Sequence, residues 1–288
     1  MKDITLQYQT AQKKIEQVFK DNERVLQNKY KQIQNDIFNL VKSTRFSRFS
    51  VADFEREGLN GLTTNNLLPE FVRMGEIKNL SVPFLYPLNE TNATIFMLTG
   101  NNSQNVCNMM KSLSLRLMCS LPTNASKFYF ADNNFGGDFS FVNSINSETV
   151  NYQVIANSEI GQVFDDMIQI ISNYNKLVNV AKETNHFIFI SNFPQGFPTD
   201  AIIKMRNLIQ NGNVRSAGIY IFFSLKENEV QKMYSGNELK QLLSDSTCIN
   251  SHINGLFPQD FYQNNEISFD TLSNGVTQRL IDMLTSDQ

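Results

Sequence analysis

The side chains that could bind a metal, form a disulfide or act on a substrate are few and widely spaced. The cysteines and histidines are Cys107, Cys119, Cys248, His186 and His252. They form neither a CxxC nor an HExxH pattern, so neither a zinc site nor a disulfide framework is predicted. The charged candidates are Lys111, Asp132 and Asp138. A lysine could hold a phosphate, and a carboxylate at a strand end could hold Mg²⁺ or cap the next turn.

These candidates lie where short apolar runs alternate with stretches of helical periodicity. Strands are predicted at residues 94–98, 127–131, 152–156, 187–190 and 218–223. Helices are predicted at residues 106–121, from about 159 to 182, at 199–210 and at 229–243, before an irregular, acidic end. This alternation predicts an α/β fold with a mostly parallel sheet. Ligands bind such sheets outside the strand C-termini, which directs attention to the loops 99–105, 132–138 and 191–198.

The first fifty residues form a basic, amphipathic arm. They contain ten Lys or Arg and five Asp or Glu, a net charge of +5, whereas the rest of the chain has a net charge of −8. Leu26, Tyr30, Ile33, Ile37 and Leu40 are spaced four, three, four and three residues apart, and no glycine or proline interrupts the arm. This spacing predicts one long helix, or a hairpin-like pair, over about residues 5–43.

Two interpretations of the arm remain open. Lys13, Lys14, Arg45 and Arg48 could contact nucleic-acid phosphates, and the two arginines stand beside aromatic residues. Alternatively, the arm docks on the rest of the chain or pairs with another copy as a coiled coil. Docking or pairing is favoured, because no base-reading motif accompanies the charges.

Residues 51–90 form a connecting segment that glycines and prolines interrupt. Within it, residues 68–77 and 80–88 are expected to be short edge strands or extended passages. The α/β domain is predicted at residues 91–288. No apolar run reaches the roughly 18 to 20 residues that cross a bilayer, and the polar start lacks the apolar segment of a signal peptide. A soluble, cytoplasmic protein is therefore predicted.

Three segments of the domain occur in an informative order: TIFMLTGNNSQNVCNMMKSLSLRLMCSLP, FYFADNNFGGDF and VRSAGIYIFFSL. Over roughly residues 92–226, their order and spacing resemble the FtsK/SpoIIIE class of DNA-pumping P-loop ATPases and the related motor subunits of type VII secretion systems. The second segment resembles the DFGGG turn of the secretion motors, and the third resembles the RAAGIHL strand of the class. The resemblance implies a RecA-like P-loop NTPase fold, with Gly136 and Gly137 in a tight turn.

The phosphate-binding loop of that class has the pattern GxxxxGK[ST], which supplies backbone N–H groups, a lysine and a hydroxyl for Mg²⁺. Aligned on this pattern, only the first glycine, Gly100, is retained. Asn105, Val106 and Cys107 replace the second glycine, the lysine and the hydroxyl residue. The vestigial nucleotide-binding residues are therefore Gly100, Asn101, Asn102, Ser103, Gln104, Asn105, Val106 and Cys107.

The acidic and sensor positions depart from the class in the same way. A family motor has Asp-Glu at a strand end, to assist Mg²⁺ and to polarise the attacking water. Ser191 and Asn192 hold these Walker B-like positions here, and the family's sensor Gln would fall near Ser224 and Leu225. No catalytic residue and no metal ligand is therefore assigned. ATP hydrolysis is disfavoured, as are ATP and Mg²⁺ as ligands, and the cofactor remains undetermined.

Three functions are consistent with these observations. The first is a catalytically degenerate FtsK/SpoIIIE-like domain that serves as a structural or regulatory module of a DNA-translocating or secretion assembly. The second is an active ATP-dependent DNA translocase subunit, in which Lys111, Asp132, Asp138 or a neighbouring subunit supplies the missing groups. The third is a non-motor interaction protein that uses the basic arm. The expected partners are a motor homologue or another copy, with DNA as a further candidate. Arg206 and Arg215 are candidates for an arginine inserted into a neighbouring subunit's site.

Overall fold

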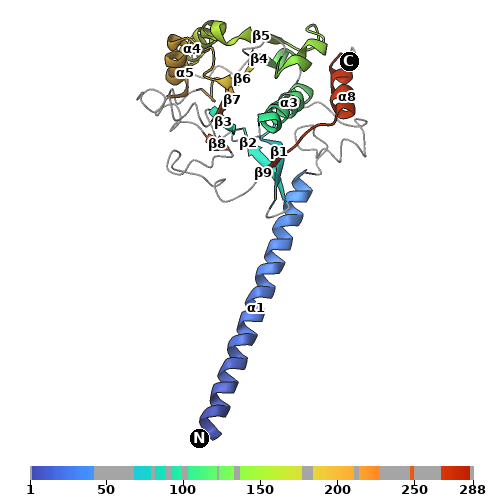
Figure 1. Cartoon of the computed structure of the whole chain (residues 1–288), viewed down its shortest axis with the longest axis vertical. Coiled ribbons are helices and arrows are strands. Elements are labelled where there is room, and N and C mark those ends of the chain that lie inside the picture. The colour runs from blue at the N-terminus through green and yellow to red at the C-terminus, as the bar shows by residue number, and fades with distance from the viewer. Residues whose placement is uncertain are drawn as a thin grey trace. The chain divides into compact units, whose positions relative to one another are not determined.

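The computed structural model describes residues 2–41, 68–78, 82–88, 93–98, 103–121, 123–132, 137–176, 184–210, 214–226, 247–249 and 267–285. The chain divides into two compact units, Met1–Ser43 and Thr44–Gln288. The first unit is a single helix, α1 (Lys2–Val41; Figure 1), so the arm is one helix and not a hairpin-like pair. None of the helices described is both long and apolar enough to cross a membrane.

A six-stranded sheet, with strand order β5-β4-β6-β7-β3-β8, is the centre of the second unit. Every neighbouring pair in this sheet is parallel, which confirms the α/β prediction. The strands are β3 (Ala93–Leu98), β4 (Ser126–Asp132), β5 (Tyr152–Ala156), β6 (Asn185–Phe193), β7 (Ile219–Lys226) and β8 (Thr247–Ile249). Short 3-10 helices, η1 (Thr123–Ala125), η2 (Ser140–Ser144) and η3 (Asn157–Glu159), follow or precede these strands.

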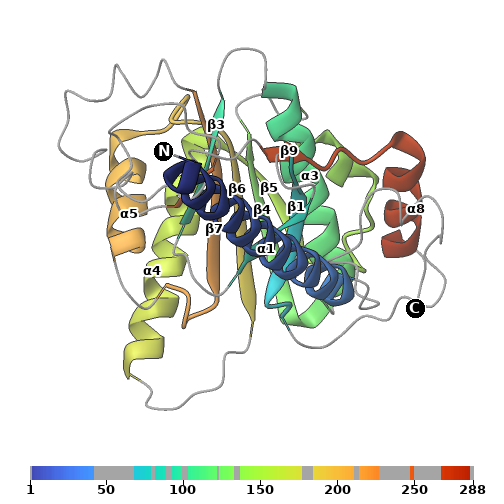
Figure 2. The same cartoon turned by 90° about the horizontal axis from the view of Figure 1, so that it is seen from below.

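Stacked aromatic rings cover one face of this sheet. Phe189 lies between Phe130 and Phe222, with ring centroids 5.4 and 5.1 Å away. A second row of stacked rings consists of Phe128, Phe187 and Tyr220. Side chains two residues apart on a strand point to the same face, so alternate aromatic positions on β4, β6 and β7 build both rows. The helices α3 (Ser103–Ser120) and α8 (Asn274–Thr285) lie on this side of the sheet (Figure 2).

Mainly aliphatic side chains fill the opposite face, which the helices α4 (Ile160–Lys176) and α5 (Thr199–Gln210) cover (Figure 2). Ile188 and Ile190 of β6 are fully buried there, together with Phe164 of α4 and Met205 of α5. The central strand β6 is therefore apolar on both faces, as expected for a parallel sheet covered by helices on both sides.

A second, three-stranded sheet has the order β2-β1-β9 and is antiparallel. Its strands are β1 (Phe71–Ile77), β2 (Val82–Pro87) and β9 (Ile267–Phe269). The first two lie where short strands were expected, but β1 is the middle strand of this sheet and not an edge strand. Gly75 allows β9 to approach, because a Cβ added to Gly75 would lie 2.1 Å from the carbonyl oxygen of Ser268. The second sheet therefore joins residues near the start of the second unit to residues near its end.

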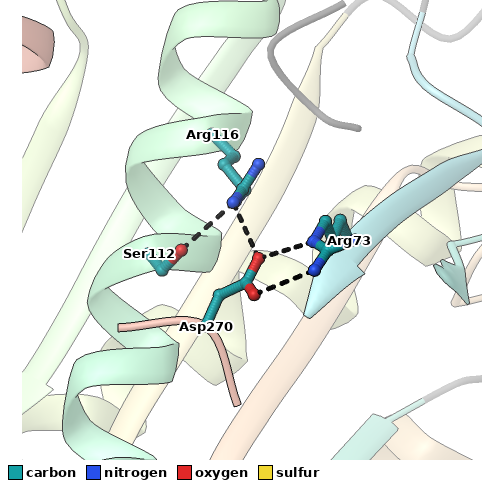
Figure 3. A network of polar contacts seen from close by, with 4 residues as sticks. All are labelled: Arg73, Ser112, Arg116 and Asp270. Atoms are coloured by element: carbon teal, nitrogen blue, oxygen red, sulfur yellow. Dashed lines mark hydrogen bonds and ion pairs between the residues drawn. The ribbon is translucent and has the colours of Figure 1, made fainter. Parts of the chain in front are cut away.

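A buried ionic network reinforces this junction (Figure 3). Asp270, which follows β9, accepts hydrogen bonds from Arg73 Nε at 2.9 Å and Arg73 Nη2 at 3.4 Å, and from Arg116 Nη2 of α3 at 2.9 Å. Arg116 Nε also donates to Ser112 Oγ at 3.2 Å. Arg116 is fully buried, and Arg73 and Asp270 are each 8% exposed. One carboxylate thus fastens β1, α3 and the segment after β9 together.

The irregular end predicted for the chain is wrong in part, because it contains β9 and α8. Ser273 begins α8 by accepting the backbone N–H of Val276 at its Oγ, 3.3 Å away. Val276, Leu280 and Leu284 are spaced four residues apart and are buried. Their spacing was a usable helix signal, because α8 is as long as α5, which the sequence predicts. The helix predicted at 229–243 lies outside the described residues.

Candidate functional site

Polar side chains gather at the edge of the six-stranded sheet where the parallel strands end. Asp132 is the last residue of β4, Ser191 and Asn192 lie near the end of β6, and Ser224 lies near the end of β7. The helix α3 begins after β3, and its second turn carries Cys107. Because the C-terminal ends of parallel strands meet at one edge, these side chains from distant parts of the chain meet there.

Asp132 has a structural role at this edge. Its side chain is 2% exposed, and its Oδ2 accepts the backbone N–H of Asp138 at 2.9 Å. The carboxylate therefore links the end of β4 to the backbone of Asp138, which agrees with a capping role.

Asp138 is the centre of a polar cluster that we call the Asp138 cluster: Cys107, Asp138, Ser191 and Asn192. Asp138 Oδ2 accepts the hydroxyl of Ser191 and, at 3.2 Å, the amide Nδ2 of Asn192. Asn192 Nδ2 also donates to Ser191 Oγ at 2.9 Å. Among the described residues, the hydrogen-bond donors to this carboxylate are therefore uncharged, and two of them are the residues predicted at the Walker B-like positions.

The backbone of β6 changes direction at the cluster. Asn192 has φ of 53°, a left-handed conformation that asparagine adopts more readily than most residues. Its backbone N–H donates to Ser224 Oγ of β7 at 2.7 Å. The register of β6 against β7 shifts between Ile190 and Phe193, so the irregularity coincides with the two residues that the sequence predicts at Walker B-like positions.

Cys107 completes the cluster from α3. Burial, the negative charge of Asp138 and a hydrogen bond to that carboxylate together raise the pKa of Cys107 to about 12. Burial is the largest of these causes, and the charge of Asp132 adds to them. The thiol is therefore protonated at neutral pH and donates to Asp138. A protonated thiol is a poor nucleophile and a poor metal ligand.

Alkylation of Cys107 tests this arrangement. At pH 9 the folded chain should hold roughly one thousandth of its Cys107 as thiolate, because the pKa lies about three units above the pH. We expect iodoacetamide to modify Cys107 much more slowly in the folded chain than in urea. Asp138→Asn removes a nearby negative charge, so it should lower the pKa of Cys107 and speed the reaction several-fold, as followed by peptide mass spectrometry.

The matched control for this experiment is Asp200→Asn, which removes an exposed carboxylate from the first turn of α5. It should leave the alkylation rate of Cys107 unchanged. Cys119 is fully buried, and burial also raises its pKa, so it should remain unmodified in both variants. Equal rates in Asp138→Asn and wild type would show that the carboxylate does not act on the thiol.

Lys111, the lysine nearest in sequence to the phosphate-loop segment, is directed elsewhere. Its Nζ lies 5.7 Å from the centroid of the Phe141 ring, which belongs to η2. Partial burial lowers the pKa of Lys111. Lysine side chains often lie over an aromatic ring, and this contact holds the ammonium group of Lys111 against η2.

Asn157 is a further buried polar residue at the same edge, and sequence reasoning missed it. It directly follows β5, is fully buried, and donates its Nδ2 to the carbonyl oxygens of Gln195 at 2.8 Å and Ser191 at 3.4 Å. Its position at the end of a predicted strand was the one available signal. The side chain ties the end of β5 to the end of β6, beside the Asp138 cluster.

The other predicted site residues are dispersed. Ser103, Gln104, Asn105 and Val106 lie in the first turns of α3, which begins three residues before the predicted start, and Val106 is fully buried. Lys13 and Lys14 are exposed on α1. Arg206 lies on α5, and the guanidinium of Arg215 lies 5.3 Å from the centroid of the Tyr220 ring. Outside the described residues are Gly100, Asn101, Asn102, Gly136, Arg45 and Arg48.

The six-stranded parallel sheet, with helices on both faces and α3 following β3, is an α/β fold that solved ATPase domains share. Among solved structures, the chain is similar to EccC (ATPases 2 and 3) of Thermomonospora curvata in complex with a signal sequence peptide. The TM-score is 0.54 at 9% identity, over 76% of this chain and 46% of that chain.

It is also similar to EssC (ATPases 2 and 3) from Geobacillus thermodenitrificans, with a TM-score of 0.50 at 13% identity, over 77% of this chain and 49% of that chain. The chain thus aligns with about half the length of both proteins. At these identities the likeness shows the fold alone. No family model and no curated protein matches the sequence.

Proposed function

We propose that the chain is a catalytically degenerate FtsK/SpoIIIE-like domain that serves as a structural or regulatory module of a secretion assembly. The observation that carries this proposal is the Asp138 cluster. A motor of this class needs a Mg²⁺-binding hydroxyl and an acidic pair, and the aligned positions are Cys107, Ser191 and Asn192. All three donate hydrogen bonds to the same carboxylate of the chain itself.

The charge of the cluster opposes nucleotide binding. A nucleotide phosphate placed beside Asp138 would meet a negative charge, because the hydrogen-bond donors to this carboxylate in the described part of the chain are uncharged. The position of the phosphate lysine holds Val106, which is fully buried and supplies no cation. Electrostatic stabilisation of the transferred phosphoryl group is the main source of catalysis in such enzymes, so its loss removes the basis for turnover.

The secretion context rests on two supports. The segment FYFADNNFGGDF resembles the turn of the secretion motors, and the fold is similar to EccC and EssC. EccC of T. curvata was solved with a signal sequence peptide. We therefore propose that the partners of this chain are proteins, either a motor homologue or a translocated polypeptide, and we favour these over DNA.

The second candidate function, an active ATPase with a nonstandard site, has one observation in its favour. Asp132 and Asp138 bring two carboxylates to the C-terminal edge of the sheet, where a motor of this class binds Mg²⁺. Both carboxylates already accept hydrogen bonds from the chain, and Asp132 is held by the backbone it caps. Because these hydrogen bonds already engage both carboxylates, we favour a degenerate domain over an active ATPase.

A nucleotide titration with a turnover assay separates the two functions. With Mg²⁺ present, a fluorescent ATP analogue should show no saturable binding below about 1 mM, a limit of about −4 kcal/mol in binding free energy. Phosphate release should equal that of a sample without protein. Tight binding with turnover that Asp138→Asn or Lys111→Ala abolishes would refute the proposal. Lys204→Ala is the matched control, because Lys204 pairs with Asp165 between α4 and α5.

A further inference from the structure

The helix α1 carries a stripe of exposed apolar side chains. At 100° per residue, Ile15, Phe19, Leu26 and Ile33 lie within about 40° of one another around the helix axis. The stripe is completed by Val18, Val25 and Tyr30 on its flanks. These seven side chains are between 42% and 71% exposed. A stripe of this kind on a water-soluble helix normally faces another surface.

The size of the stripe matches what a stable pair of helices needs. Residues 15 to 33 extend along about 27 Å of helix. At their exposed fractions, the seven side chains present on the order of 700 Å² of surface, close to the roughly 800 Å² that each partner contributes to a standard interface. Two copies of α1 could therefore cover each other's stripes almost completely.

The charges on α1 permit two copies to approach. Lys2–Val41 contains seven basic and five acidic side chains, a net charge of +2, so repulsion between copies is weak. Acidic residues such as Glu16, Asp21 and Glu23 share the polar surface with the lysines, unlike the uniformly basic polar face of helices that bind anionic lipids. This mixed surface favours a protein partner over a membrane.

Two polar residues inside the stripe, Asn22 and Lys29, select the orientation of the pair. In a parallel pair in register, each Lys29 ammonium would face the Lys29 of the other copy. In an antiparallel pair centred on Leu26, Lys29 lies level, within one residue, with Asn22 of the other copy, whose side-chain oxygen can accept its hydrogen bond. Polar residues at such positions set the register of helix pairs.

The same antiparallel arrangement also matches the apolar residues. Centred on Leu26, it places Ile15 level with Ile37 of the other copy and Phe19 level with Ile33, while Leu26 meets its own counterpart. We infer that α1 is a self-association helix, whose stripe pairs antiparallel with the stripe of a second copy of this chain. This inference is independent of the proposed function, because it depends only on α1.

Sedimentation velocity of the full chain tests the pairing. At a protein concentration of tens of micromolar, the wild-type chain should sediment as a dimer, with twice the 33.0 kDa mass of one chain. Leu26→Gln/Ile33→Gln removes two central contacts with a residue that favours helix, and it should weaken self-association at least a hundred-fold. The matched control, Lys20→Gln/Lys31→Gln, changes the opposite face and should remain dimeric. A monomeric wild-type chain, or a dimeric stripe variant, would overturn the inference.

Crosslinking tests the orientation and does not depend on the stability of the double variant. Under mild oxidation, Leu26→Cys should form a covalent dimer through its own counterpart, above the background of the wild-type chain. Ile15→Cys should not, because in an antiparallel pair the two copies of residue 15 lie on the order of 30 Å apart. Crosslinking of Ile15→Cys as fast as Leu26→Cys would overturn the antiparallel arrangement.

Discussion

Replacing Asp270 with asparagine should lower the free energy of unfolding by about 3 to 5 kcal/mol, the usual cost of removing one partner from a buried ion pair. Asp270 accepts hydrogen bonds from Arg73 and Arg116, and all three side chains are buried. The variant would leave two buried guanidinium groups facing an uncharged amide. Urea unfolding followed by circular dichroism, with midpoint and slope fitted together, measures the loss.

A matched control uses another aspartate near the end of the chain. Asp282 on α8 accepts Gln278 Nε2 at 2.8 Å in an exposed setting, so Asp282→Asn should cost less than about 1 kcal/mol. If Asp270→Asn cost no more than Asp282→Asn, the network would contribute little, and the junction between β1, α3 and β9 would depend on apolar contacts.

Truncating Phe189 to alanine should cost about 3 to 5 kcal/mol, the range for deleting a buried aromatic ring. Phe189 is fully buried at the middle of its row and stacks on Phe130 and Phe222. The neighbouring rings cannot easily move into the cavity, because each is held in place by its own strand. The same urea titration measures the effect, and the denaturant slope should stay unchanged if unfolding remains two-state.

Phe189→Leu is the companion variant for this position. It keeps most of the buried volume while it removes the stacking, so it should cost about 1 to 2 kcal/mol. Similar losses in the leucine and alanine variants would indicate that ring stacking, and not the filling of space, gives Phe189 its contribution.

The sequence was sufficient for the strand–helix alternation because β4, β6 and β7 are apolar runs separated by clear helical periodicity. The sequence was less informative about where strands end and about very short strands. The strand β6 continues through Ser191 and Asn192, although both are polar, because it pairs with β7 again beyond them, at Phe193. The strands β8 and β9 have three residues each, too few for a periodic pattern, and their partners are distant in sequence.

The candidate site, too, was predictable from the sequence only in part. Alignment on a motif predicts that Cys107, Ser191 and Asn192 hold the positions of a phosphate loop and an acidic pair, because the order of the segments along the chain resembles that of the motors. The position of Asp138 among them could not be read from the sequence, since it depends on how the chain returns after Asp132. Asn157 was missed because an asparagine after a strand is usually only a turn residue.

The pairing of β1 with β9 and the ion pair between Arg73 and Asp270 have a consequence for how the chain is made. The paired groups are 197 residues apart, so a large loop must close before either contact forms. The contacts among β4, β6 and β7 involve shorter separations and are available earlier during synthesis. On the ribosome, the three-stranded sheet therefore cannot be completed until Asp270 has emerged. We therefore expect the pairing of β1 with β9, and the ion pair beside it, to form late in the folding of the second unit.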